Sequence, residues 1–147
     1  MKIQAIIEMP QGSFLKYEVD KTNGGLFLDR VLNQGVPYSY GFVPNSRCPD
    51  GDPLDIFLLS EFHIYPLTRV NVEIVGAIRC LDNGVKDDKL LAVIQDDFQS
   101  QAKVEIIVKY LKTYKEGFIV EGLSNEDEAI QIYKDAIKMY DASADST

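Results

Sequence analysis

Three aspartates lie within six residues of the chain, in the segment DGDPLD of residues 50–55. The apolar run of residues 56–59 follows at once, so the carboxylates stand at the start of a predicted buried strand. Two carboxylates about 4 Å apart repel by roughly 4 kcal/mol at an effective dielectric near 20. A hard divalent cation, which prefers oxygen ligands, offsets that repulsion. The segment therefore indicates a Mg²⁺-type site, and the alternative is a surface turn ahead of a strand.

The same segment does not fit the calcium loop of an EF-hand. Counting from Asp50, position 12 is Glu61, as that loop requires. Position 6, however, is Asp55 instead of the glycine of the sharp turn, and positions 7 to 10 are strand-like. The EF-hand is therefore excluded.

A second acidic cluster surrounds a predicted hairpin turn. Asp82, Asp87 and Asp88 flank the turn signal Asn83-Gly84, and Lys89 follows them. Aspartates are common in turns, so this cluster by itself is explained more readily by the hairpin than by function.

Basic and aromatic residues are scattered along the predicted strands, among them Lys16, Arg30, Tyr40 and Tyr114. Each one alone is more typical of a solvated strand face or of the core. Together with cation-binding carboxylates, they suit a small polyanionic substrate that carries metal ions. Phosphoryl transfer requires charge neutralisation on the attacked and leaving oxygens, and it needs neither histidine nor cysteine.

Composition narrows the class of protein. The 147 residues suit one domain, which we expect over residues 1–140, with 141–147 as a disordered tail. The net charge of −8 argues against nucleic-acid binding, and no apolar run is long enough to span a membrane. Cys48 and Cys80 lack metal or redox spacing, which favours reduced thiols and the cytoplasm. The single histidine, His63, argues against a histidine-based zinc site or triad.

The order of the predicted elements favours an α+β domain built on a small barrel. Strands are predicted over residues 3–9, 14–19, 26–29, 54–59, 70–80 and 90–94. Helical spacing follows over 104–114 and again up to residue 140, with Ser124 as the predicted cap of the last helix.

The ordered set of motifs resembles the soluble family I inorganic pyrophosphatases of bacterial type. The matching segments are Glu8 ahead of Pro10, KYEVDK at 16–21, LDR at 28–30, YG at 40–41, DGDPLD at 50–55, Asp82, DDKL at 87–90 and YK at 114–115. The resemblance covers about residues 3–140 and implies a five-stranded OB-like β-barrel with flanking helices in the C-terminal half. It also implies hydrolysis of pyrophosphate to two orthophosphates by metal-activated water, and a cytoplasmic homohexamer.

The resemblance implies a role for each matching residue. The metal ligands would be Asp50, Asp55, Asp82 and Asp87, and Asp52 would be the base for the attacking water. The phosphate-binding residues would be Lys16, Arg30, Tyr40, Lys89, Tyr114 and Lys115. Glu8 and Glu18 would orient metal-bound waters or basic side chains. Several Mg²⁺ ions would bind at each active site, with Mn²⁺ as a substitute.

One departure from the family pattern lies near the tyrosine–glycine pair. Val36 precedes Pro37 where many bacterial relatives carry a tyrosine, so a polar contact is expected to be missing. The rival interpretation is a binding module, in which an OB-like barrel holds a metal or an oligonucleotide without turnover. The acidic charge and the lack of a basic, aromatic groove weigh against the oligonucleotide version.

Overall fold

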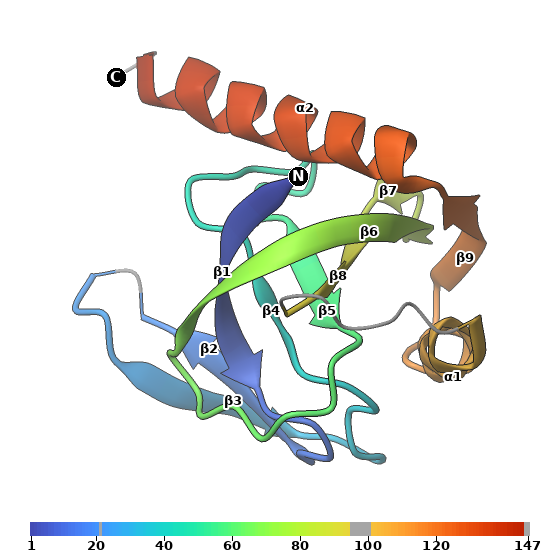
Figure 1. Cartoon of the computed structure of the whole chain (residues 1–147). Coiled ribbons are helices and arrows are strands. Elements are labelled where there is room, and N and C mark those ends of the chain that lie inside the picture. The colour runs from blue at the N-terminus through green and yellow to red at the C-terminus, as the bar shows by residue number, and fades with distance from the viewer. Residues whose placement is uncertain (21, 95–100, 146–147) are drawn as a thin grey trace.

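The computed structural model describes residues 1–20, 22–94 and 101–145 (Figure 1). The strands of this part are β1 (Lys2–Met9), β2 (Leu15–Val19), β3 (Leu26–Val31), β4 (Tyr40–Phe42), β5 (Asp55–Leu58), β6 (Arg69–Asp82), β7 (Val85–Lys86), β8 (Lys89–Val93) and β9 (Phe118–Ser124). The helices are α1 (Gln101–Lys112) and α2 (Glu126–Asp145). The predicted α+β class is confirmed, and the predicted strands shift by a few residues at their ends.

The main sheet runs through five strands and returns to its starting strand. β1 pairs with β4, β4 with β5, β8 with β6, and β6 with β1, all antiparallel. The β5–β8 pair is parallel. This parallel pair sets Asp55 opposite Lys89, so the two predicted clusters start from neighbouring strands. Strands β7 and β9 pair with the far part of β6.

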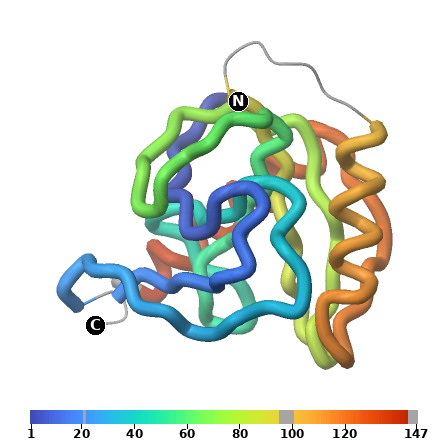
Figure 2. Tube along the Cα trace, turned by 90° about the horizontal axis from the view of Figure 1, so that it is seen from below, coloured from blue at the N-terminus to red at the C-terminus, as the bar shows by residue number. Residues whose placement is uncertain are grey.

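Strands β2 and β3 form a separate two-stranded hairpin beside β1. Its tip, around residues 22–25, extends away from the rest of the chain in Figure 2. The hairpin carries Lys16, Glu18 and Arg30, and register places Lys16 opposite Arg30. These basic residues therefore reach the main sheet from one side.

Two hydrophobic clusters hold the helices on the sheet. Helix α2 packs beside β6 at the top of Figure 1, and its Ala129 and Ala136 belong to a cluster that includes the fully buried Ile56. Helix α1 contributes Ile107 and Leu111 to the second cluster. Burial of such apolar side chains stabilises the fold by roughly 1.5–3 kcal/mol for each large side chain.

The predicted cap of the last helix is wrong by one residue. Ser124 ends β9, where it pairs with Ala77 of β6. Asn125 caps the helix instead, since its Oδ1 accepts the Glu128 amide at 2.9 Å. The Asn125 amide donates to Glu128 Oε1 at 3.0 Å, which completes a reciprocal capping box.

The second half of the chain is less helical at its centre, and more helical at its end, than predicted. Strand β9 lies in a part that was expected to hold helices, and it pairs with β6. Helix α2 continues to Asp145, so the predicted disordered tail is wrong for 141–145. Residues 146–147 lie outside the described residues. Neither described helix has an apolar stretch that could cross a bilayer.

Candidate active site

A cleft of about 570 Å³ opens between the sheet, the β2–β3 hairpin and the loop before β5. All the predicted site residues except Arg30 line it. They are Glu8, Lys16, Glu18, Tyr40, Asp50, Asp52, Asp55, Asp82, Asp87, Lys89, Tyr114 and Lys115. Arg30 reaches the same region through Tyr114, because its guanidinium donates to the Tyr114 hydroxyl at 3.1 Å. The fold thus brings together residues that are up to 107 positions apart.

The aspartate loop is held by hydrogen bonds among residues 43–54, from both main-chain and side-chain atoms. Gly51 has φ of +89°, a left-handed conformation that favours glycine, and its amide donates to Cys48 O at 2.9 Å. The Asp52 amide donates to Asp50 Oδ1 at 3.0 Å. Ser46 Oγ donates to Val43 O at 2.6 Å and accepts the Leu54 amide at 2.9 Å. These contacts fix the loop before any ligand binds.

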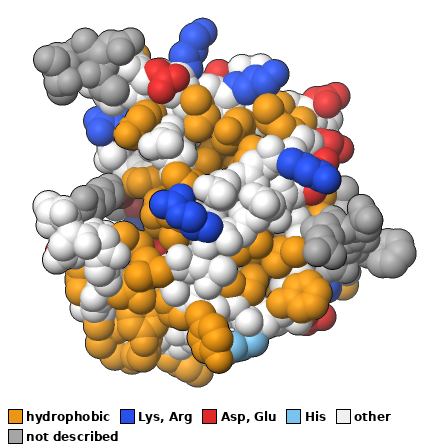
Figure 3. Space-filling view, turned by 60° about the vertical axis from the view of Figure 1, so that its left-hand side comes forward, with side chains coloured by type: hydrophobic (Ala, Val, Ile, Leu, Met, Phe, Trp, Pro, Cys, Tyr) orange, Lys and Arg blue, Asp and Glu red, His pale blue; other side chains and the backbone are white. Residues whose placement is uncertain are grey.

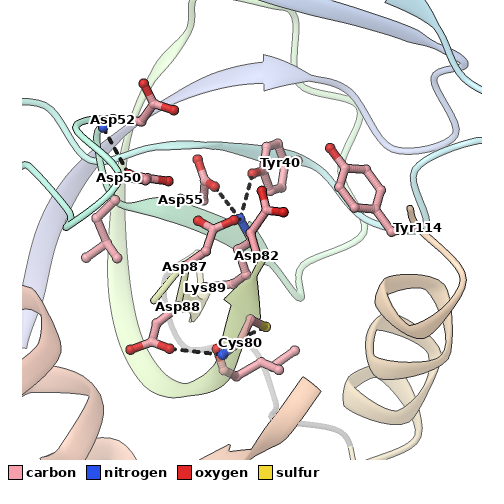
Figure 4. Close-up of polar contacts among 12 residues, drawn as sticks. Tyr40, Asp50, Asp52, Asp55, Cys80, Asp82, Asp87, Asp88, Lys89 and Tyr114 are labelled. Atoms are coloured by element: carbon pink, nitrogen blue, oxygen red, sulfur yellow. Dashed lines mark hydrogen bonds and ion pairs between the residues drawn. The ribbon is translucent and has the colours of Figure 1, made fainter. Parts of the chain in front are cut away.

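Lys89 lies at the centre of the carboxylates (Figure 4). Its ammonium contacts Asp55 directly and Asp87 at 3.0 Å, and Tyr40 Oη lies 3.5 Å away. Only 3% of Lys89 is exposed. Burial opposes its charge, but Asp55 and Asp87 outweigh that effect and raise the pKa of Lys89. The ammonium therefore stays charged and holds the two carboxylates together.

The two adjacent aspartates after the hairpin turn, Asp87 and Asp88, contact different partners. Figure 4 shows Asp87 directed toward Lys89 and Asp88 directed toward Cys80. The Asp88 carboxylate is buried and accepts the Cys80 amide at 3.0 Å. Asp82, at the start of the turn, pairs with Lys115 at 2.7 Å. Asp88 is thus a structural residue, whereas Asp82 and Asp87 face the cleft.

On the hairpin side, Lys16 of β2 and Arg30 of β3 lie near Tyr114, which follows α1. Lys16 lies 3.4 Å from Glu18 and 3.8 Å from Asp29. Tyr114 contacts the Arg30 guanidinium, which lies 5.8 Å from its ring centroid. A phosphate group placed here would meet charge-assisted donors from two elements that are remote in sequence.

Burial, and then the neighbouring carboxylates, raise the pKa values of acidic residues in the cleft. Burial, and then the charges of Asp55 and Glu18, raise the pKa of Glu8 from 4.5 to about 8. Burial also raises the pKa of Asp50, with Asp52 and Asp55 adding to the effect. Such shifts are typical of sites that bind a cation or carry out acid–base chemistry.

The donor set fits a hard cation in its chemistry. The acidic residues of the cleft offer oxygen ligands, which suit Mg²⁺ and Mn²⁺. No group of three acidic, histidine or cysteine side chains among the described residues is arranged as a ready-made metal cage. Lys89 occupies the space between Asp55 and Asp87 with its own positive charge. A bound cation would therefore share these carboxylates with Lys89.

Val36 is packed into the core instead of the cleft. It is 2% exposed and belongs to the cluster of Phe57 and Leu111. Val36 lines a small pocket that shares Lys16, Tyr40, Lys89 and Tyr114 with the cleft. The valine side chain contributes apolar packing at this position and can form no hydrogen bond.

Sequence reasoning missed the wall of the cleft that faces α2. Asn45, Arg47 and Tyr140 line this side. Asn45 has φ of +58°, a conformation that asparagine tolerates better than most residues. No spacing rule points to these residues, because they come from a loop and from the end of a helix. Tyr140 was predicted only as the end of the helical spacing in the last helix.

Comparisons with known proteins agree with this geometry. The inorganic pyrophosphatase family profile matches residues 5–141. The inorganic pyrophosphatase of Campylobacter jejuni is 34% identical over an alignment of 158 positions, which covers 95% of this chain and 92% of the relative. Soluble inorganic pyrophosphatase 2 of Chlamydomonas reinhardtii is 35% identical, covering 94% of this chain and 80% of the relative. A solved structure of the inorganic pyrophosphatase of Helicobacter pylori superposes with a TM-score of 0.89 at 33% identity, covering 95% of this chain and 94% of the other. The chain therefore belongs to the inorganic pyrophosphatase family.

Proposed function

We propose that this chain hydrolyses pyrophosphate to two orthophosphates in the cleft described above. The observation that carries the proposal is the meeting of two acidic segments, residues 50–55 and 82–87, with lysine and tyrosine side chains in one cleft. Phosphoryl transfer needs carboxylates that bind metal ions, and it needs positively charged groups that bind the phosphate oxygens. Membership of the family supports the same reaction.

Asp50, Asp55, Asp82 and Asp87 would hold Mg²⁺, several ions for each site, with Mn²⁺ as a substitute. Such an ion lowers the pKa of bound water and neutralises charge on phosphate oxygens. The four carboxylates come from the loop before β5, from β5 itself and from the β6–β8 region, so the fold sets their spacing.

Asp52 would accept the proton of the attacking water. Asp52 is exposed on the cleft wall. Two hydrogen bonds fix its backbone: the Asp52 amide donates to Asp50 Oδ1, and the Asp52 carbonyl accepts the Cys48 amide. A general base must be positioned within hydrogen-bond reach of the proton it takes. Glu8 and Glu18 would orient metal-bound waters or basic side chains around it.

The remaining predicted residues would bind the two phosphate groups. These are Lys16, Arg30, Tyr40, Lys89, Tyr114 and Lys115. Lys89 and Lys115 already pair with aspartates of the proposed metal site, so each can exchange a carboxylate for a phosphate oxygen. Arg30 can grip phosphate bidentately, which a lysine cannot do.

We further propose that the five strands that return to β1 form an OB-like barrel, and that residues 1–140 act as one catalytic domain. The chain would act in the cytoplasm as a homohexamer, without nucleic-acid partners. Support for self-association comes from exposed apolar side chains, including Phe14, Phe27, Val31, Phe62 and Tyr65. Figure 3 shows apolar side chains gathered on the face that it views.

A phosphate-release assay tests the reaction. With Mg²⁺ the purified chain should convert pyrophosphate to phosphate and should strongly prefer it to ATP. Excess chelator should abolish turnover. Binding of Mg²⁺ without any release of phosphate would favour the binding-module alternative, and a comparable kcat/KM for ATP would indicate a general nucleotide phosphohydrolase.

A further inference from the structure

Four basic side chains line the cleft, namely Lys16, Arg47, Lys89 and Lys115. Three of them already engage carboxylates: Lys16 with Glu18 and Asp29, Lys89 with Asp55 and Asp87, and Lys115 with Asp82. Arg47 forms no ion pair with any residue that the structure describes. It is therefore the cleft cation whose charge is most available to a ligand.

The backbone around Arg47 is fixed. Its amide donates to Ala136 O of α2 at 3.0 Å. The preceding Ser46 is buried and bonded through its hydroxyl to Val43 and Leu54, and the following Cys48 is buried with its amide on Asp52 O at 2.8 Å. The Arg47 side chain is exposed at this anchored position. An anchored backbone lowers the entropy cost of binding, because only the side chain has to be ordered.

Arg47 belongs to the wall of the cleft that lies away from Tyr114. In Figure 4, Asp50 and Asp52 lie on one side of the Lys89 cluster and Tyr114 lies on the other. Arg47 is in the loop that carries Asp50 and Asp52, and it shares the wall with Asn45 and Tyr140. The proposed pyrophosphate-binding residues Lys16, Tyr114 and Lys115 come from other elements.

The cleft is large for a ligand of two phosphate groups. Its volume of about 570 Å³ lies within the range of roughly 300–1,000 Å³ that is usual for sites of drug-sized molecules. We propose that Arg47 forms a further phosphate subsite on the α2 side of the cleft, which receives a phosphate group beyond the two of pyrophosphate. The ligand is either the distal phosphate of linear tripolyphosphate or a separate orthophosphate ion. This inference rests on the proposed assignment of the cleft as the active site.

Inhibition of pyrophosphate hydrolysis tests the subsite. Tripolyphosphate and orthophosphate are each titrated as inhibitors at constant free Mg²⁺, against the wild type, Arg47→Leu, Arg47→Lys and the control Arg69→Leu. Arg69 is an exposed arginine on β6 that bonds to Gln4 and does not line the cleft. The control removes the same charge elsewhere, and unchanged melting temperatures show that the variants fold.

We expect Arg47→Leu to raise the inhibition constant of one or both ligands by about tenfold, which is the lower end for loss of a charge-assisted hydrogen bond. Arg47→Lys should recover part of the loss, and Arg69→Leu should change neither constant by more than about twofold. A rise for tripolyphosphate alone identifies a chain-extending subsite, and a rise for orthophosphate alone or for both identifies a site for the free ion as well.

Less than a twofold change for both ligands in Arg47→Leu, or an equal change in Arg69→Leu, would overturn the subsite. This failure is distinct from a failure of the active-site assignment. Full turnover in an Asp52→Asn variant would refute the assignment, whereas the Arg47 measurement can fail while that assignment stands.

Discussion

The basic residues of the site are of two kinds, buried and exposed, and Lys89 is the buried one that lies among the carboxylates. Lys89 is buried and bridges Asp55 and Asp87, whereas Arg30 is exposed and bonds to a tyrosine hydroxyl. A buried charge and an exposed one make different contributions to folding, even when both are proposed to bind phosphate.

Replacing each of these residues should therefore have distinct effects on stability. Lys89→Met leaves two carboxylates without their cation, and we expect it to lower the free energy of unfolding by about 3–5 kcal/mol in chelator. Arg30→Ala should change that free energy by about 0.5 kcal/mol or less while lowering kcat/KM by about tenfold or more. Urea unfolding and steady-state kinetics measure both. Equal losses of stability in the two variants would contradict this assignment.

Asp52 and Asp55 should separate proton transfer from metal binding. Asp52→Asn retains the main-chain bonds of the loop, so we expect kcat to fall by about 10²-fold or more with Mg²⁺ affinity largely kept. Asp55→Asn removes a charge from a proposed metal ligand and should weaken Mg²⁺ binding directly. Calorimetric titration with Mg²⁺ beside steady-state assays distinguishes the two. The roles are wrong if Asp52→Asn loses Mg²⁺ as severely as Asp55→Asn.

Glu8 should make the metal-free protein less stable as pH rises. Its pKa is raised from 4.5 to about 8 by burial and by Asp55 and Glu18. Between these values the folded chain holds a proton that the unfolded chain has released, so stability falls with rising pH in this window. In a Glu8→Gln variant the side chain is uncharged at every pH, so this variant lacks that loss of stability. The melting temperature of Glu8→Gln relative to wild type should therefore increase from pH 5 to pH 8 in chelator, and a constant difference across this range would refute the shift.

At the scale of elements, the close contact of β1 and β4 places Tyr40 beside the site. Gly41 lies opposite Ile7 in this pair. A Cβ on Gly41 would lie 2.0 Å from Ile6 O and 2.8 Å from Ile6 C, both backbone atoms. Neither atom can move without displacing β1.

We expect Gly41→Ala to lower the free energy of unfolding by about 3 kcal/mol or more, since the strands must separate. The matched control is Gly25→Ala in the turn of the β2–β3 hairpin, where the new Cβ meets only the Asn23 side chain, at 3.1 Å. That control should change stability by about 1 kcal/mol or less. Urea unfolding of both variants gives the comparison, and similar losses would show that the β1–β4 approach is not limiting.

Short-range signals in the sequence located many of the elements and the acidic segments. Alternating and apolar runs predicted β1, β5, β6 and β8, and the Asp50–Asp55 segment was correctly placed at the start of a buried strand. The β9 strand was missed because its exposed positions include the apolar Ile119 and Leu123, so the sequence does not show the alternation of its burial. Its pairing partner also lies about 40 residues earlier. The cap was misplaced because Ser124 and Asn125 can both serve, and strand pairing selects between them.

The same limit applies to the site. Resemblance to a family supplied residues that spacing alone could not distinguish from solvated positions, such as Lys16 and Arg30. Residue type and spacing did not separate Asp87 from Asp88, and only the resemblance to the family chose Asp87. Their different directions depend on the hairpin and on Cys80. Arg47 was missed because its proposed role depends on the absence of a carboxylate partner among the described residues. That absence is a property of the folded cleft, and the sequence does not show it.

At the scale of the whole molecule, the proposed homohexamer has a direct test. One chain has a mass of 16.5 kDa, so six should sediment at about 99 kDa. Exposed apolar side chains would be covered in such an assembly, and their burial stabilises association by about 25 cal/mol per Å². Sedimentation equilibrium in Mg²⁺ measures the mass. A mass of one chain, or of any assembly other than six, would contradict the hexamer.

The pairing of β6 has a consequence for synthesis of the chain on the ribosome. Residues 69–73 of β6 pair with β1, which is made before them, but residues 77–82 pair with β9, which ends at Ser124. Until residues 118–124 have left the exit tunnel, that edge of β6 has no partner strand from this chain among the described residues. Unpaired edges invite pairing with other chains. A nascent or truncated chain that stops before Phe118 should therefore be prone to aggregation and should depend on chaperones, although it already contains almost every residue of the proposed active site.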